Sequence, residues 1–142
     1  MSLNAALSRA AARRQVAPVQ VSQSKAVPAK TLSVFTRQWS ALMSAGIPIS
    51  QAFELLSQSI VGTRATQKAF GNTLQTLQTE LNAGQSLHIA FKKHPQVFNQ
   101  HYCSLLHAGE SAGILDTILS RLADTLEAHA TLKAKLKNAL IY

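Results

Sequence analysis

The sequence predicts an all-α fold, a six-helix bundle of short antiparallel amphipathic helices. From about residue 31 onward, apolar residues recur at steps of three and four, which is the spacing of one helix face. No strand-like alternation is longer than the stretch VAPVQV. Aromatic residues are few (five Phe, two Tyr and one Trp), which favours helices over sheets. Each predicted helix is too short to be stable alone, so the helices must pack on one another.

Glycine, proline and small polar residues divide the first half of the helical region. Gly46 ends the first helix, and Pro48 suits the first turn of the second. Gly62 interrupts the chain, Thr63 is a suitable N-cap for the third helix, and Gly84 stops that helix. The inward-facing residues expected for these helices are Leu32, Phe35, Trp39 and Leu42; Ile49, Ala52, Phe53, Leu56 and Ile60; and Phe70, Leu74, Leu77 and Leu81.

Similar signals divide the second half into three more helices. Ser86 is the expected cap of a short fourth helix that Pro95 ends, and Asn99 is the expected cap of the fifth. The longest helix follows Gly113. The inward-facing residues expected here are Leu87, Ala90 and Phe91; Tyr102, Leu105 and Leu106; Leu115, Ile118, Leu119, Leu122 and Leu126; and then Leu132, Leu136 and Leu140. The six-residue step from Leu126 to Leu132 breaks the rhythm, so the last turns should face a different neighbour.

The positive charge is concentrated at the N-terminus. The chain carries 14 basic and six acidic residues, a formal charge of +8. Five of the basic residues and none of the acids fall within residues 1–30: Arg9, Arg13, Arg14, Lys25 and Lys30. We therefore expect a flexible basic tail and linker over 1–30, with a short basic helix at 1–14, and a helical domain over 31–142. The tail also resembles an organelle transit peptide, which is a minor alternative.

The sequence contains no constellation typical of an enzyme. It has no Gly-rich phosphate loop, no HExxH and no GxSxG motif. Cys103 is the single cysteine and suits a small core residue. His101 and His107 are six residues apart, so on a helix they point about 120° apart, which is poor for shared metal ligation. We therefore predict no enzymatic activity, no catalytic residue and no cofactor-binding residue.

A nucleic-acid-binding module is the alternative from another functional class. The chain has two small basic groups, Lys92, Lys93 and His94, and Lys133, Lys135 and Lys137. Short helices joined by glycine turns could form a helix-turn-helix. However, no helix combines several Arg, Asn or Gln residues on one face with an obvious turn before it, and charge runs of this kind are more often solvated helix faces. We therefore expect no nucleic-acid partner.

The C-terminal stretch indicates a nearby membrane. After Glu127 there is no acid, three lysines follow, and the sequence stops at the apolar ALIY. Lysines just before an apolar segment are typical of a cytoplasmic juxtamembrane helix. An ordinary frayed terminus is the plain alternative. We expect that the chain is truncated before a first membrane helix.

The stretch HAGESAGILD at residues 107–116 has almost no bulky side chains. Another backbone can therefore approach it closely, and Gly113 can adopt the left-handed conformation that ends a helix. Asp116 falls in the first turn of the next helix, where the helix dipole favours an acid. Glu110 lies near the end of the preceding helix, where the dipole disfavours it. Glu110 should therefore have a partner, either an arginine, a backbone N–H or a cation.

Several motifs in order resemble the type II secretion F domain family. FTRQWSALMSAGIPISQAFELL contains F-x-R-Q and A-G-[IL]-P-[IL], and GQSLHIAF contains G-x-S-[LF]. HPQVFNQHYCSLLHAGESAGILDTILSRLADTLE contains P-x-x-F and A-G-E-x-x-G-x-L-[DE], and LKAKLKNALIY resembles the lead into a membrane helix. The resemblance covers about residues 32–142. Its signature residues in this chain are Phe35, Arg37, Gln38, Gly46, Pro48, Gly109, Glu110 and Gly113.

The resemblance implies a fold and a role. The family comprises inner-membrane platform proteins of type IV pilus and type II secretion machines, and this chain looks closer to the pilus branch (PilC-like) than to the secretion branch (GspF-like). A first cytoplasmic domain of such a protein is a six-helix bundle, often a dimer. It would be a non-enzymatic scaffold that couples a hexameric assembly ATPase to pilin polymerisation on the cytoplasmic side of the bacterial inner membrane. Its partners would be that ATPase, pilins, other inner-membrane assembly proteins and a second copy of itself.

Two hypotheses follow for Glu110, and one for the partner surface. Glu110 pairs with Arg37 of the F-x-R-Q motif, or Glu110 and Asp116 bind a hard cation such as Ca²⁺. We favour the structural pairing because two carboxylates supply few of the six or more oxygens that calcium prefers. Candidate contacts to an acidic partner are Arg64, Lys68, Lys92 and Lys93, which are equally compatible with a purely solubilising role.

Overall fold

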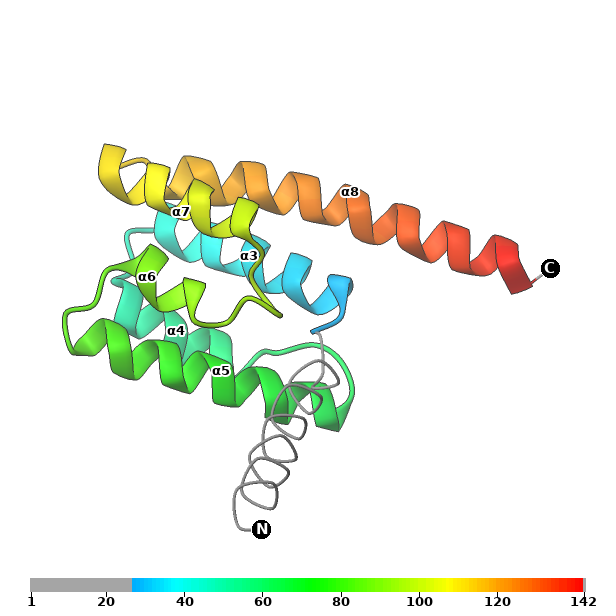
Figure 1. Cartoon of the computed structure of the whole chain (residues 1–142), viewed down its shortest axis with the longest axis horizontal. Coiled ribbons are helices and arrows are strands. Elements are labelled where there is room, and N and C mark those ends of the chain that lie inside the picture. The colour runs from blue at the N-terminus through cyan, green and yellow to red at the C-terminus, as the bar shows by residue number, and fades with distance from the viewer. Residues whose placement is uncertain (1–26, 142) are drawn as a thin grey trace, which may run out of the picture.

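The computed structural model describes residues 27–141, which form six helices and no strand (Figure 1). The helices are α3 (Ala29–Ser44), α4 (Ile49–Ser57), α5 (Arg64–Asn82), α6 (Leu87–Lys92), α7 (Gln100–Ala112) and α8 (Leu115–Ile141). The predicted all-α bundle is confirmed. The basic helix expected at 1–14, and the linker up to residue 26, lie outside the described residues.

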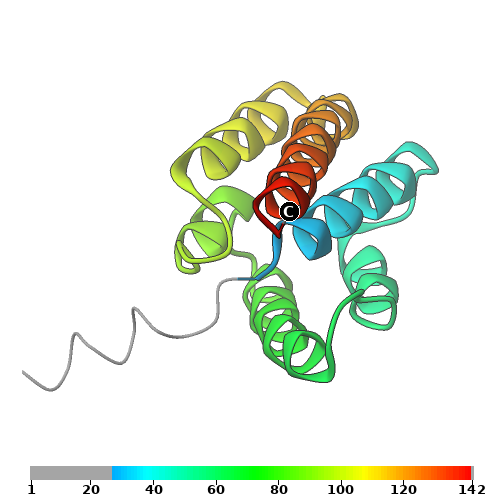
Figure 2. The ribbon, with the colours of Figure 1, turned by 90° about the vertical axis from the view of Figure 1, so that its right-hand side faces the viewer.

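The helices form an up-and-down bundle around one core. Successive helices run in alternate directions, and Figure 2 shows the six helices arranged around a common centre. The most extensive packing is between the first and last described helices, α3 and α8. The α4 helix packs on α5, and α7 packs on both α6 and α8. The first and last helices of the domain are thereby held together.

Aromatic rings fill the centre of the bundle. Trp39 is completely buried and stacks on Phe91, with ring centroids 5.4 Å apart and an interplanar angle of 18°. The same cluster contains Phe35, Phe53, Phe70, Phe98 and Tyr102. The expected inward-facing residues from Leu32 to Leu126 all belong to the core or pack against it. The sequence periodicity therefore placed these residues correctly, but it did not include Phe98, which lies outside the helices and is 1% exposed.

The helices begin and end close to the predicted boundary residues, with small differences. The hydroxyl of Thr63 accepts a hydrogen bond from the Thr66 N–H at 3.2 Å, and the side chain of Asn99 accepts one from the Tyr102 N–H at 2.8 Å. Both N-caps are therefore confirmed. The α3 helix begins at Ala29, two residues before the expected start of the domain, and Pro48 occupies the N-cap of α4 rather than its first turn.

A buried hydrogen bond joins α3 to α7. The hydroxyl of Thr36 donates to the Leu32 carbonyl at 2.8 Å, so the Tyr102 hydroxyl 2.9 Å away donates to Thr36. Burial raises the pKa of Tyr102, which keeps the phenol protonated. The bond satisfies two polar groups inside an otherwise apolar core.

Candidate functional site

The corner between α7 and α8 is built around two glycines. Gly113 ends α7 with φ +71°, the left-handed conformation predicted for it. Gly109 is buried one turn earlier. A Cβ added at Gly109 would lie 3.0 Å from Ile118 Cγ1 and 3.2 Å from Leu115 Cα. The absence of a side chain at Gly109 therefore lets the start of α8 pack directly on α7, as the small-residue stretch indicated.

Glu110 reaches from α7 to the N-terminus of α6. Its Oε2 accepts a hydrogen bond from the Leu87 N–H at 2.8 Å. Ser86 is the N-cap residue by position, but its side chain makes no capping bond. The capping group is therefore the Glu110 carboxylate, which lies at the positive end of the α6 dipole. This explains why an acid is tolerated near the C-terminus of α7: a backbone N–H, one of the three expected partner types, holds it.

The predicted pairing of Glu110 with Arg37 is wrong. Arg37 instead joins α3 to α8, where its Nε lies 3.0 Å from one oxygen of Glu127 and its Nη2 lies 2.8 Å from the other. The same Nη2 also bonds to Asp124. These hydrogen bonds raise the pKa of Arg37 and lower the pKa of Glu127. The acids on α8 are nearer to α3 than Glu110 is, because α3 packs most extensively on α8.

A second group beside Glu110 was not anticipated from the sequence. Glu110 Oε1 lies 3.2 Å from His88 Nδ1, and the ring of His88 lies 4.0 Å from the ring of His107, measured between centroids. One donor atom from each of these three residues lies within 4.8 Å of the other two. Asp116 is in the first turn of α8, as predicted, but it does not belong to this group. The calcium hypothesis for Glu110 and Asp116 stays a prediction.

The candidate partner-binding cations do not form one patch. Arg64 and Lys68 are exposed in the first turns of α5. Lys93 lies 3.3 Å from Glu80, which is near the other end of the same helix. At 1.5 Å per residue, the 16 residues from Arg64 to Glu80 span about 24 Å. The predicted set therefore divides into two surfaces, with Arg64 and Lys68 on one and Lys92 and Lys93 on the other.

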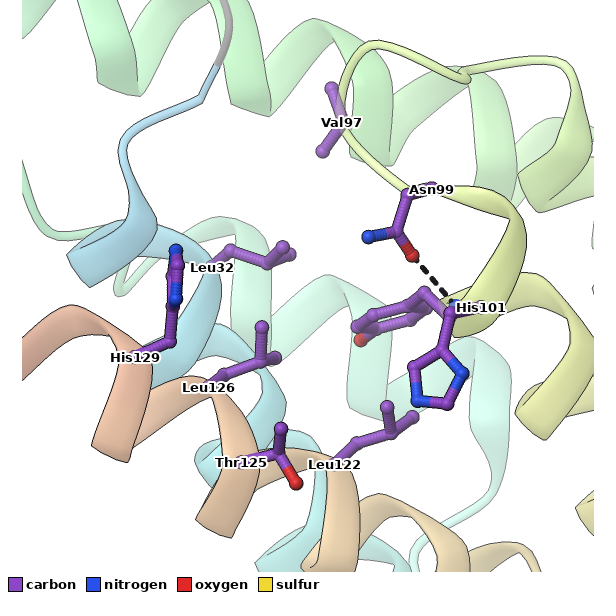
Figure 3. A pocket seen from close by; sticks show the side chains of 9 residues that line it. Leu32, Val97, Asn99, His101, Leu122, Thr125, Leu126 and His129 are labelled. Carbon is purple, nitrogen blue, oxygen red and sulfur yellow. Dashed lines mark hydrogen bonds between the residues drawn. The ribbon is translucent and has the colours of Figure 1, made fainter. Parts of the chain in front are cut away.

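A small pocket opens between α3, α7 and α8 (Figure 3). It is lined by Leu32, Val97, Asn99, His101, Tyr102, Leu122, Thr125, Leu126 and His129. Its volume of about 240 Å³ is below the roughly 300–1,000 Å³ of typical small-molecule sites. His101 lines this pocket whereas His107 contacts His88, so the prediction that the two do not share one site is confirmed.

The buried thiol has no feature of a nucleophile. Cys103 is 1% exposed, as expected for a small core residue. Burial raises the pKa of this thiol, which disfavours the reactive thiolate.

The last turns of α8 leave the bundle. Leu132, Leu136 and Leu140 are 56%, 57% and 87% exposed and form an apolar stripe at four-residue spacing. At about 100° per residue, Leu132 lies about 120° around the helix from Leu126, but the stripe drifts back, and Leu140 points in the same direction as Leu122, five turns earlier. The stripe is exposed because these turns extend beyond the other helices (Figure 1). That these turns face a different neighbour stays a prediction, because no described residue covers the stripe. Within residues 27–141, no helix has both the length and the apolar character that a membrane crossing needs.

Known proteins resemble the chain over most of its length. Type IV pilus assembly protein PilC of Myxococcus xanthus is 36% identical over 116 residues, which cover 82% of this chain and 27% of that protein. Type 4 fimbrial assembly protein PilC of Pseudomonas putida is 40% identical over 108 residues, which cover 76% and 26%. Type II secretion system protein F of Vibrio cholerae is 28% identical over 111 residues, which cover 78% and 26%.

The region of similarity coincides with the folded domain. The chain spans about a quarter of the length of these curated relatives. The family described as Type II secretion system (T2SS), protein F, matches residues 35–142, which run from the middle of α3 to the end of the chain. The sequence motifs that suggested this family all fall within that region. The chain therefore belongs to the type II secretion system protein F family.

Proposed function

We propose that this chain is a cytoplasmic domain of the inner-membrane platform protein of a type IV pilus machine. In this role it is a non-enzymatic scaffold that couples a hexameric assembly ATPase to pilin polymerisation. The observation that carries the proposal is its family membership over residues 35–142. The pilus branch is favoured because five pilus assembly relatives are 31–40% identical to this chain, whereas three secretion relatives are 28–33% identical.

The geometry of α8 supports a scaffold that transmits motion. This helix contains 27 residues and packs along α3 before it leaves the bundle. An ion-pair network at Arg37 ties α3 and α8 together at the surface, and the buried core ties them inside. A force applied to the bundle is therefore carried along one continuous helix toward the lysines and leucines of its last turns. Lysines beside an apolar stripe suit the cytoplasmic face of a membrane.

The test is binding to the hexameric ATPase of the same machine. The 142-residue chain should be retained by the immobilised ATPase, and a DNA gel shift run in parallel should show no complex. Retention without a DNA complex supports the scaffold. DNA binding that weakens steeply with salt, without ATPase retention, would instead support the basic nucleic-acid module.

Two pairs of charge reversals locate the contact surface. The variant Arg64→Glu with Lys68→Glu and the variant Lys92→Glu with Lys93→Glu alter the two separate surfaces, so each serves as the control for the other. If an acidic ATPase surface meets one of them, only that variant loses affinity, and the loss shrinks as salt is raised. Equal affinity for both variants and the parent chain would remove these four residues from the contact.

A further inference from the structure

We propose that His88, His107 and Glu110 form a binding site for a divalent transition-metal ion, with Zn²⁺ as the reference ion. Two imidazoles and one carboxylate are a donor set that zinc commonly uses. The three side chains come from two helices, since His88 belongs to α6 whereas His107 and Glu110 belong to α7. The proposal is independent of the platform function.

The backbone positions of the three ligands are fixed by the core. His88 directly follows Leu87, which is 1% exposed, and His107 directly follows Leu106, which is completely buried. His107 and Glu110 are three residues apart on α7, so they lie on the same side of that helix. The site is therefore built on two packed helices and not on a mobile loop, which limits the rearrangement that metal binding requires.

The distances are compatible with one small ion. Zinc binds imidazole nitrogen and carboxylate oxygen at about 2.0–2.2 Å, so two ligand atoms of a tetrahedral site lie about 3.3 Å apart. Glu110 Oε1 and His88 Nδ1 are already 3.2 Å apart. The donor atom of His107 lies within 4.8 Å of both. His107 is exposed and free to change its side-chain torsions, so a small rotation can complete the set.

The second oxygen of Glu110 orients the carboxylate. Because Oε2 accepts the Leu87 N–H at 2.8 Å, the other oxygen is directed toward His88. Hydrogen bonds of this kind commonly hold metal-binding carboxylates in place. Binding would replace the hydrogen bond between Oε1 and His88 by two bonds to the ion, and any proton on the ligating nitrogen would leave. A water can take the fourth position.

The donor set also distinguishes this site from the calcium hypothesis. Calcium prefers six or more oxygen ligands, and two of the three donors here are nitrogens. The zinc and calcium hypotheses both use Glu110, but they make different predictions at His107. If the His88, His107 and Glu110 site is correct, zinc binding depends on His107 and excess Ca²⁺ does not displace it.

The test uses the whole chain without a histidine tag. Zn²⁺ is titrated against the protein in competition with a chromophoric chelator, and one equivalent is expected to bind. His107→Ala should weaken binding by at least about tenfold, a loss of the size seen even when the partners of metal ligands are removed. His101→Ala is the matched control, because His101 is also exposed on α7 but lines the pocket of Figure 3. It should bind zinc like the parent chain.

Two further measurements distinguish zinc binding at this site from nonspecific zinc binding to other histidines, and from a loss of binding caused by unfolding. Co²⁺ should give visible absorption bands in the parent chain that His107→Ala loses and His101→Ala keeps. Zn²⁺ should raise the melting temperature of the parent chain but not that of His107→Ala, whose melting temperature without metal should match the parent. No zinc binding, equal losses in the two variants, or displacement of zinc by excess Ca²⁺ would each overturn the proposal.

Discussion

The close approach of α7 and α8 at Gly109 predicts a destabilising glycine-to-alanine substitution. In Gly109→Ala the new Cβ would lie 3.0 Å from Ile118 Cγ1 and 3.2 Å from Leu115 Cα. The second of these is a backbone atom, so relief requires a shift of α8 and not a change of rotamer. Overpacking of this kind costs about 1–3 kcal/mol. Alanine is favoured over glycine inside a helix by about 1 kcal/mol, so the net loss of unfolding free energy is about 0–2 kcal/mol.

A second glycine in a helix interior supplies the control. In Gly71→Ala the new Cβ would meet only Ile60 Cδ1, at 3.7 Å, which is an ordinary van der Waals contact. This variant should gain about 0.5–1 kcal/mol of unfolding free energy from helix propensity alone. The helix preference is common to both substitutions, so the difference between the two variants isolates the overpacking cost of about 1–3 kcal/mol.

Urea unfolding followed by circular dichroism measures both variants under one set of conditions. The two curves should share the slope of the parent chain and differ in midpoint, because the amount of surface exposed on unfolding hardly changes. If Gly109→Ala proved as stable as Gly71→Ala, α8 would not be seated on α7 in the way the structure shows.

Three other substitutions test contacts elsewhere in the bundle. Tyr102→Phe removes the hydroxyl that donates to Thr36, and should cost about 0.5–1.5 kcal/mol in urea unfolding; no change would argue against the bond. A second substitution, His94→Gln, tests a partly buried histidine. Partial burial lowers the pKa of His94 from its ordinary value of 6.5, so as the pH falls this imidazole is protonated in the unfolded chain before it is protonated in the folded chain. Stability should therefore fall as the pH drops below about 6.5, and the His94→Gln curve should be flatter; parallel curves would contradict this. Arg37→Gln should lower the melting temperature at low salt, and raising NaCl should shrink the difference, whereas a salt-independent loss would point to packing and not to charge.

The fold was predictable because its signals are local. The three-and-four spacing of apolar residues depends only on helix geometry, and it placed Trp39 and Phe91 in the core before any contact was known. Caps such as Asn99 and the stop at Gly113 depend on residues within one turn. Each of these signals acts within a few residues, so one sequence contains all the information that the prediction needs.

The candidate site was less predictable because its partners are far apart in the sequence. Ser86 has the residue type of an N-cap, yet the cap is supplied by Glu110, 23 positions from the Leu87 N–H that it accepts. Nothing local distinguishes Asp124 or Glu127 from Glu110 as the partner of Arg37; only the packing of α8 on α3 decides. The three-residue spacing of His107 and Glu110, which places both on one side of α7, was a usable signal for part of the proposed metal site.

Because α8 is continuous, the direction in which its exposed leucines point is fixed relative to its buried face. Each residue of a helix advances the chain by about 1.5 Å and turns it by about 100°. Deleting a single residue between Leu126 and Leu132 would leave the buried face unchanged but swing the exposed leucine stripe about a quarter turn around the rod. A surface that binds this stripe must match its direction as well as its apolar character. A partner that binds this stripe would therefore constrain the number of residues between the bundle and the stripe as well as their identity, and length variation there would be tolerated only in whole helical turns.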